Sequence, residues 1–177
     1  EYAAKEGENV IEIDPGMAFG TGTHHTTNMM MERLEKVITP EAEVFDVGTG
    51  SGILAIAAAM LGAKSVKAVD IDAVAVRVAR ENVADNGLTE QIEVREGDLL
   101  HGTEGKADVI IANIIADIII MLLKDIPQKL NDDGIFLASG IIEERVPDIE
   151  AEAQKQGLVV DAIDHRGGWV VMQMRHK

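Results

Sequence analysis

From residue 44 onward, short runs of apolar residues alternate with longer amphipathic or alanine-rich stretches. This alternation predicts strands separated by helices, and therefore a parallel sheet with helices on both faces. Continuous apolar runs such as Val109–Ile111 are typical of parallel strands that are buried on both sides. The predicted strands are 44–47, 66–69, 92–94, 109–111 and 135–138, and the predicted helices are 53–61, 73–86, 119–130 and a segment around 146–153.

Two further apolar runs, 159–163 and 169–174, lie close together near the end of the sequence. The link between them, His165–Gly168, is too short for the helical crossover that two parallel strands require. These two strands are therefore expected to pair antiparallel. The predicted architecture is an α/β domain with a doubly wound, mostly parallel sheet and an antiparallel terminal hairpin.

Residues 1–43, here called the lead-in, lack this alternation of strands and helices and precede the domain at 44–177 that shows it. Its glycine and threonine residues gather in one stretch, and its last third has apolar residues on one helical face. The expected elements are a strand at 10–13, a turn at 14–16, a loop over 16–27 and a helix that carries Met30, Leu34, Val37 and Ile38 and ends before Pro40.

Three alternating glycines, Gly48, Gly50 and Gly52, follow the first predicted strand. Ligands of open α/β sheets bind beyond the carboxyl ends of the strands, where glycines let the backbone turn sharply and approach a ligand closely. Asp70 ends the second predicted strand, where such folds place a carboxylate that accepts hydrogen bonds from a ribose. The pattern indicates a nucleoside cofactor. The alternative is a tight strand-to-helix turn that binds nothing.

The charge beside the glycines distinguishes between cofactors. The dinucleotide fingerprint needs a third glycine where Ile53 stands, and the carboxylate of Asp46 would repel a pyrophosphate. A P-loop is disfavoured because no lysine follows the glycines before Lys64. S-adenosylmethionine carries a sulfonium and an ammonium but no phosphate, so it tolerates Asp46 or gains from it. The sequence therefore favours S-adenosylmethionine over NAD.

Polar residues after the third and fourth predicted strands are further candidates for this pocket. Asp98 is placed either to accept a hydrogen bond from an adenine amino group or to form a plain surface turn. Asn113 interrupts an apolar stretch, and a buried amide without partners costs about 1–3 kcal/mol. Asn113 is therefore a candidate for binding a ligand, with capping of the next helix as the alternative. Asp117 is expected to be the N-cap of that helix.

Three ring side chains attract other interpretations. His24 and His25 are adjacent, and adjacent side chains normally diverge. No HExxH helix or cysteine supports them as metal ligands, so no metal site is expected. Trp169, the only tryptophan, is expected to pack in the core beneath the terminal hairpin, with a position facing a substrate as the alternative.

Charge and composition limit the partners. Asp and Glu number 31 against 16 Lys and Arg, which gives a formal net charge of −15, and only 3% of the residues are aromatic. Nucleic-acid binding needs cations along the phosphates and rings that stack on bases, so no direct nucleic-acid partner is expected. An acidic field instead favours a cationic partner. Asn113 and Asp117 interrupt the most apolar region, 109–123, so no membrane-spanning helix is expected.

Four sequence motifs resemble those of one known family. Residues 14–27 read DPGMAFGTGTHHTT and resemble the DPGxAFGTGTHxTT signature of the PrmA family, the methyltransferases that modify large-subunit ribosomal protein eleven. Residues 46–52 are similar to the DxGxGSG loop of that family. Residues 69–72 (VDID) and 112–116 (ANIIA) are similar to its VDID and ANILA motifs. The resemblance covers nearly the whole chain.

This resemblance implies a Rossmann-like class I methyltransferase domain with a seven-stranded sheet. It implies that S-adenosylmethionine contacts Thr27, Gly48, Asp70 and Asn113. It also implies a cytoplasmic protein and a basic ribosomal protein substrate, methylated at its N-terminal α-amine and at lysine ε-amines. Many amine methyltransferases continue with Pro-Pro-aromatic after the asparagine, whereas Ile-Ile-Ala follows Asn113, so the resemblance transfers only the catalytic, amine-holding role of the asparagine.

Family members carry an N-terminal substrate-recognition domain that is joined by a short linker. This sequence begins at Glu1 rather than at a methionine, and residues 1–9 resemble the remnant of such a linker, so the recognition domain is expected to be missing. Two alternatives stay open. The protein methylates another protein lysine or a small molecule, or this fragment binds the cofactor and is inactive without its missing domain.

Overall fold

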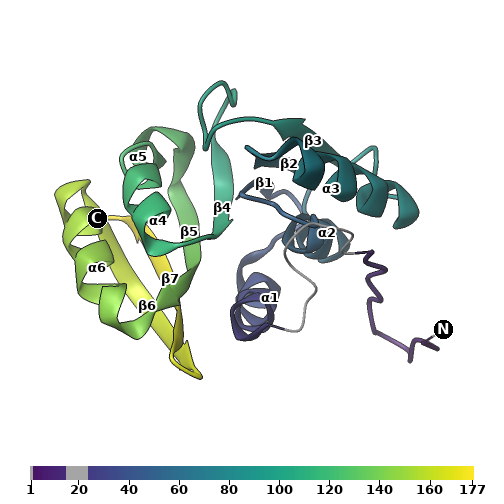
Figure 1. The fold of residues 1–177 in the computed structure, drawn as a ribbon, viewed down its shortest axis with the longest axis horizontal. Coiled ribbons are helices and arrows are strands. Elements are labelled where there is room, and N and C mark those ends of the chain that lie inside the picture. The colour runs from purple at the N-terminus through teal and green to yellow at the C-terminus, as the bar shows by residue number, and fades with distance from the viewer. Residues whose placement is uncertain (1, 15–23) are drawn as a thin grey trace.

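The computed structural model describes residues 2–14 and 24–177. Within them, seven strands form one sheet in the order β3-β2-β1-β4-β5-β7-β6 (Figure 1). The predicted turn at 14–16, the loop at 16–27 and Glu1 lie wholly or partly outside the described residues. The strands are β1 (Glu43–Val47), β2 (Ser65–Asp70), β3 (Ile92–Glu96), β4 (Ala107–Asn113), β5 (Leu130–Ile142), β6 (Leu158–Arg166) and β7 (Trp169–His176).

The pairing directions confirm the predicted fold. The strands from β3 to β5 in the sheet order pair parallel, and β7 pairs antiparallel with both β5 and β6. The hairpin link consists of Gly167 and Gly168, whose φ angles are 58° and 80°. A two-residue turn with positive φ at both positions matches the twist of the flanking strands, and glycine adopts it without steric cost.

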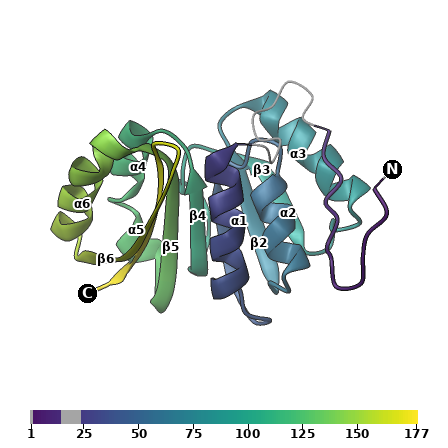
Figure 2. The ribbon, with the colours of Figure 1, turned by 90° about the horizontal axis from the view of Figure 1, so that it is seen from below.

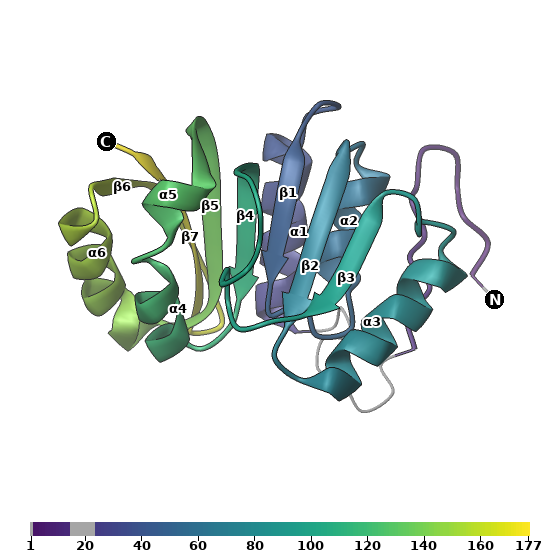
Figure 3. The same cartoon turned by 90° about the horizontal axis from the view of Figure 1, so that it is seen from above.

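Helices cover both faces of the sheet. Side chains of α1, α2 and α3 belong to one buried cluster, and those of α4, α5 and α6 to a second. Figure 2 shows α1 and α2 in front of the sheet, and Figure 3 shows α4, α5 and α6 beside β5 and β7. The helices are α1 (His25–Val37), α2 (Ile53–Met60), α3 (Ala73–Asp85), α4 (Ala116–Leu122), α5 (Ile126–Lys129) and α6 (Val146–Lys155), and a 3-10 turn spans Glu143–Arg145.

The last helix of the lead-in is part of the main core. Met29, Met30 and Leu34 of α1 are at most 2% exposed and belong to the same cluster as α2. The division of the chain at residue 43 stays a prediction. Among the helices of the described part of the chain, none is long and apolar enough to cross a membrane.

Two predicted elements are wrong. The single helix at 119–130 is divided into α4 and α5, because Pro127 lies in the first turn of α5 and cannot continue a preceding helix. Leu130, expected on the face of that helix, is the first residue of β5. Residues 10–13 are not a strand. The backbone of Glu12 pairs with the side chain of Asn86, the C-cap residue of α3, instead of with another strand.

Candidate functional site

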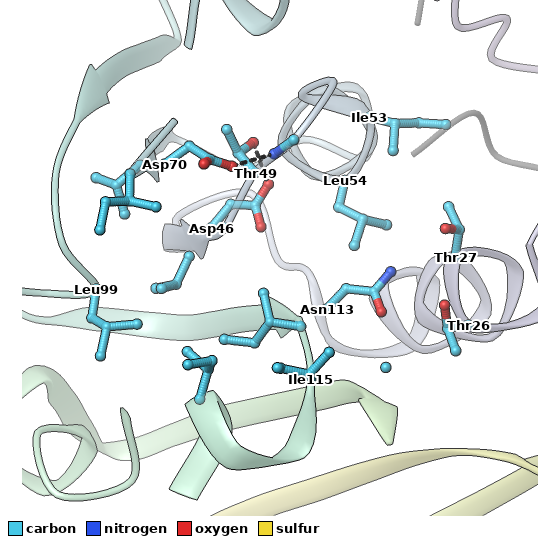
Figure 4. Close-up of a pocket in the computed structure, with 18 of the residues that line it drawn as sticks. Thr26, Thr27, Asp46, Thr49, Ile53, Leu54, Asp70, Leu99, Asn113 and Ile115 are labelled. Carbon is cyan, nitrogen blue, oxygen red and sulfur yellow. Dashed lines mark hydrogen bonds between the residues drawn. The ribbon is translucent and has the colours of Figure 1, made fainter. Parts of the chain in front are cut away.

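A cavity of about 570 Å³ opens at the carboxyl ends of β1, β2 and β4, the edge at which the sequence places a ligand (Figure 4). Every predicted cofactor-binding residue except Gly52 lines it, together with two of the ring side chains and several apolar side chains that were not predicted. The predicted residues and rings that line the cavity are His24, Thr27, Asp46, Gly48, Gly50, Asp70, Asp98, Asn113 and Trp169.

The glycine loop turns back against β2. The N–H groups of Gly48 and Thr49 both donate to the carbonyl oxygen of Val69, at 2.9 and 3.0 Å. Gly48 and Gly50 have φ angles of 72° and 56°, in the left-handed region that favours glycine. A Cβ atom on Gly48 would lie 2.5 Å from Cγ2 of Ile114, so both the backbone conformation and the space require glycine there.

Gly52 has a different role from the one the sequence suggested. It does not line the cavity, and it forms the N-cap of α2 with a φ of 86°. A Cβ atom there would lie 3.3 Å from Cβ of Ala79 on α3. The close packing of the loop against α3 therefore accounts for this glycine.

Asp70 fixes the glycine loop from the end of β2. Its two carboxylate oxygens accept hydrogen bonds from the N–H groups of Gly50, at 2.9 Å, and Asp72, at 3.0 Å. Each oxygen of an ionised carboxylate keeps a further lone pair after one such bond. Since Asp70 is half-buried at the cavity wall, it retains the capacity to accept hydrogen bonds from a ligand hydroxyl.

Asp46 is the most deeply buried acidic group of the site. It is 1% exposed, and Oγ1 of Thr49 donates to its carboxylate at 2.7 Å. Burial is the main cause that raises the pKa of Asp46 to about 7. The negative charge of Asp70 also raises this pKa, whereas the hydrogen bond from Thr49 lowers it. At neutral pH this carboxyl is therefore poised between its neutral and ionised forms.

Asn113 and two threonines form the opposite side of the cavity. Figure 4 shows Asn113, the last residue of β4, near Thr26 and Thr27, away from Asp70 and Thr49. Both threonines lie in the first turn of α1 and are 1% exposed. The site thus places a carboxylate at one side and an amide with two hydroxyls at the other.

The predictions for the start of α4 need correction. Ile115 is its N-cap residue and makes no side-chain capping bond, so Asn113 does not cap the helix. Asp117 is not the N-cap either; it lies in the first turn and accepts a hydrogen bond of 2.6 Å from Arg145. A carboxylate in the first turn is also favourable to the helix dipole, which explains why the sequence pattern suggested a cap.

The ring centroids of the adjacent histidines lie 6.4 Å apart, and the ring planes are tilted by 59°. His24 is the N-cap of α1, accepts a hydrogen bond from the N–H of Thr26 and meets the Trp169 ring edge to face at 4.9 Å. His25 is exposed. In the described part of the chain, no three metal-ligating side chains gather into a group. Trp169 packs against the core, as predicted, and it also lines the cavity.

Sequence reasoning missed the aliphatic walls of the cavity. Ile71 and Ile115 are 71% and 65% exposed, although both line it. Leu99 also lines the cavity, and its φ of 52° lies in the left-handed region that non-glycine residues rarely adopt. Ile71 and Leu99 directly follow Asp70 and Asp98, so their position next to predicted site residues is the signal that points to them.

Replacing Gly48 with valine is expected to weaken S-adenosylmethionine binding more than a hundredfold, because a side chain there meets Ile114 and strains a backbone φ of 72°. Gly87→Val is the control: Gly87 has a φ of 68°, and a Cβ atom added there would have no other atom within 4 Å. Both variants carry similar backbone strain, but only the first crowds the loop. Calorimetric titration checks this; equal affinities in the two variants would contradict the role of Gly48.

The strand order, the terminal hairpin and a cavity between a glycine loop and an acidic β2 end together define the class I methyltransferase fold. The chain belongs to the family described as ribosomal protein L11 methyltransferase (PrmA), whose model matches residues 1–177. The predicted resemblance is confirmed.

Relatives and solved structures agree with this family. The chain is 51% identical over 177 residues to the ribosomal protein L11 methyltransferase of Caldanaerobacter subterraneus, of which it covers 57%, and 51% identical over 172 residues to that of Alkaliphilus metalliredigens, of which it covers 54%. It thus spans about half the length of these relatives.

A solved structure of a ribosomal protein L11 methylase from Lactobacillus delbrueckii subsp. bulgaricus has a TM-score of 0.94 at 38% identity, with 100% of this chain and 90% of that chain covered. The structure of M. capricolum TrmK in complex with S-adenosyl-homocysteine is a more distant match, with a TM-score of 0.72 at 18% identity. The match covers 86% of this chain and 70% of that one. At this identity it shows a shared fold alone.

Proposed function

We propose that this chain is the S-adenosylmethionine-binding domain of a protein N-methyltransferase that modifies amines of a ribosomal protein. The observation that carries the proposal is the cavity that joins Asp70 and the glycine loop on one side to Asn113 on the other. Membership of the L11 methyltransferase family supports the reaction class. We also propose a cytoplasmic location, where ribosomal proteins are made.

The residues of the cavity fit the cofactor chemically. Asp70 offers acceptor oxygens for a ribose diol, and the glycine loop allows close backbone approach. Ile71 and Leu99 offer apolar walls for a flat base, with Asp98 beside them as an acceptor for its amino group. No lysine or arginine lines the cavity in the described part of the chain, which suits a ligand without phosphate. Thr27 offers a hydroxyl on the side of Asn113.

S-adenosylmethionine supplies an activated methyl group, so the task left to the protein is to align a neutral amine with it. In this proposal the side-chain oxygen of Asn113 accepts a hydrogen bond from the amine and so orients its lone pair. An α-amine has a reference pKa of about 7.7–8.0 and a lysine about 10.4, so the lysine loses its proton less readily. Desolvation beside the apolar walls lowers the pKa of either amine by disfavouring the cation.

His24 is a poor candidate for the base that removes the amine proton. Its Nδ1 atom lies 2.8 Å from Oγ1 of Thr26 and 3.3 Å from the backbone nitrogen of the same residue, so this nitrogen is engaged at the start of α1. We therefore assign the amine proton to solvent and no dedicated base to the described residues.

A basic ribosomal protein fits the formal net charge of −15, because an acidic field concentrates cationic partners. The experiment is transfer of labelled methyl groups from S-adenosylmethionine by the full-length protein to ribosomal protein L11, to other lysine-rich proteins and to small amines. We expect L11 to be labelled on its N-terminal α-amine and on lysines. Labelling of another class alone would refute the proposed substrate. Running the 177-residue chain beside the full-length protein tests whether recognition requires the remaining half.

Binding of the cofactor near pH 7 is expected to release a fraction of a proton. The pKa of Asp46 is raised to about 7, so its carboxyl is partly protonated before binding, and a cation in the cavity lowers that pKa. Affinity should accordingly rise as the pH increases through 7. Calorimetry in phosphate and in Tris buffer measures the release as a buffer-dependent enthalpy. Asp46→Asn should remove the dependence, and identical enthalpies for wild type in both buffers would contradict it.

A further inference from the structure

Two asparagines of α3 and its C-cap pair with the backbone of the lead-in. Oδ1 of Asn82 accepts the N–H of Asp14 and its Nδ2 donates to the carbonyl oxygen of Asp14, both at 3.0 Å. Asn86, one helical turn further on, pairs in the same way with Glu12, at 3.0 and 2.7 Å. Figure 2 shows this part of the lead-in beside α3.

These contacts supply to residues 12 and 14 the backbone hydrogen bonds that a neighbouring strand would otherwise supply. In an extended chain, alternate residues present their N–H and C=O groups to the same side, and Glu12 and Asp14 are two residues apart. The residues between and before them, Ile13 and Ile11, pack against the core cluster of α1 and α2. Asparagine side chains of α3 and its C-cap thus provide, at Glu12 and Asp14, the hydrogen bonds that a neighbouring strand would have made.

Asn82 also connects this segment to the glycine loop. Its Nδ2 atom donates a second hydrogen bond, at 2.8 Å, to the carbonyl oxygen of Ser51, which lies between Gly50 and Gly52. Asn82 is 1% exposed, and its two N–H donors are both used by these bonds. Asn86 makes no such bond to the loop; its second donor goes to the backbone of α3. One buried amide thus holds two segments that are far apart in sequence.

We propose that Asn82 is a positioning residue of the cofactor site, which couples docking of Asp14 to the order of the glycine loop. Loss of its amide takes this donor away from the buried carbonyl oxygen of Ser51 and removes both backbone bonds between Asp14 and α3 at the same time. The inference rests on the proposed function in taking S-adenosylmethionine as the ligand of the loop.

The first test compares Asn82→Ala with Asn86→Ala in the full-length protein. Each variant removes an asparagine and its pair of bonds to one residue of the lead-in, but only Asn82→Ala removes the bond to the loop. We expect the Kd for S-adenosylmethionine to rise about tenfold in Asn82→Ala, as the loss of one buried hydrogen bond implies, and to change less than about twofold in Asn86→Ala. Equal changes in the two variants would overturn the coupling.

A second measurement, hydrogen exchange, begins with wild type and separates the inference from the proposed function. Coupling between two sites is reciprocal, so saturating S-adenosylmethionine should slow hydrogen exchange of the Asp14 amide in wild type about tenfold. If wild type binds the cofactor and Asp14 exchange is unchanged, the inference fails and the proposed function stands. If wild type does not bind the cofactor, the proposed function fails, and the coupling is then tested in the ligand-free variants. Faster exchange of the Gly50 and Gly52 amides in Asn82→Ala than in Asn86→Ala supports the coupling, and equal exchange refutes it.

Discussion

Replacing Asp70 with alanine is expected to lower the affinity for S-adenosylmethionine at least a hundredfold while the chain stays folded. The carboxylate offers acceptors for two ribose hydroxyls, and hydrogen bonds to a charged group contribute about 1.5–3 kcal/mol each. The same change removes the acceptor for the N–H of Gly50, so the glycine loop loses an anchor together with the ligand. Calorimetric titration measures the affinity, and circular dichroism confirms the fold.

Asp72→Ala is the matched control for this experiment. Asp72 lies two residues away and carries the same charge, but its side chain caps α3 by accepting the N–H of Val74 at 2.9 Å and does not line the cavity. Its loss costs about 1 kcal/mol of stability through the cap and should change the affinity less than about threefold. Similar losses of affinity in both variants would assign the effect of Asp70 to general electrostatics and contradict its place in the site.

Asn113→Ala is expected to reduce the rate of methyl transfer about a hundredfold and to change cofactor affinity only slightly. In the proposed mechanism its amide orients the attacking amine, and misplacement of a reacting group by about 1 Å costs on the order of a hundredfold in rate. The measurement is single-turnover transfer to ribosomal protein L11 by the full-length protein at saturating cofactor, with the Kd determined separately.

Asn131→Ala provides the comparison, since Asn131 also belongs to the sheet but binds Asp108 at 2.9 Å and does not line the cavity. Its transfer rate should match that of wild type. A wild-type rate in Asn113→Ala would remove the amine-holding role. A lower affinity at an unchanged rate would instead make Asn113 a residue that binds only the cofactor.

The sequence predicted those parts of the molecule that depend on local pattern. The parallel strands, the terminal hairpin and the positions of Gly48 and Asp70 follow from apolar runs and from residues at strand ends. The break between α4 and α5 was missed because the apolar side chains on both sides of it remain buried, so helical periodicity continues through Pro127. A proline within an apolar stretch was the signal against one continuous helix.

Other features depend on tertiary contacts that no local pattern contains. The need for glycine at position 52 comes from the close approach of Ala79. The backbone hydrogen bond of Glu12 is made to Asn86, which lies 74 residues away in the sequence. The pocket position of Trp169 arises because β7 brings it beside His24 at the start of α1. In each case the partner comes from a distant segment, so the residue type alone was compatible with several roles.

The place of β7 in the sheet determines the order in which the molecule can be completed. β6 is made before β7, yet among the described strands its only neighbour in the sheet is β7, which lies between β6 and β5. The edge of β5 therefore stays open, and β6 has no strand to pair with, until residues 169–176 have been synthesised. Until then the nascent chain presents a sheet edge with unpaired N–H and C=O groups, the kind of edge that other strands can pair with.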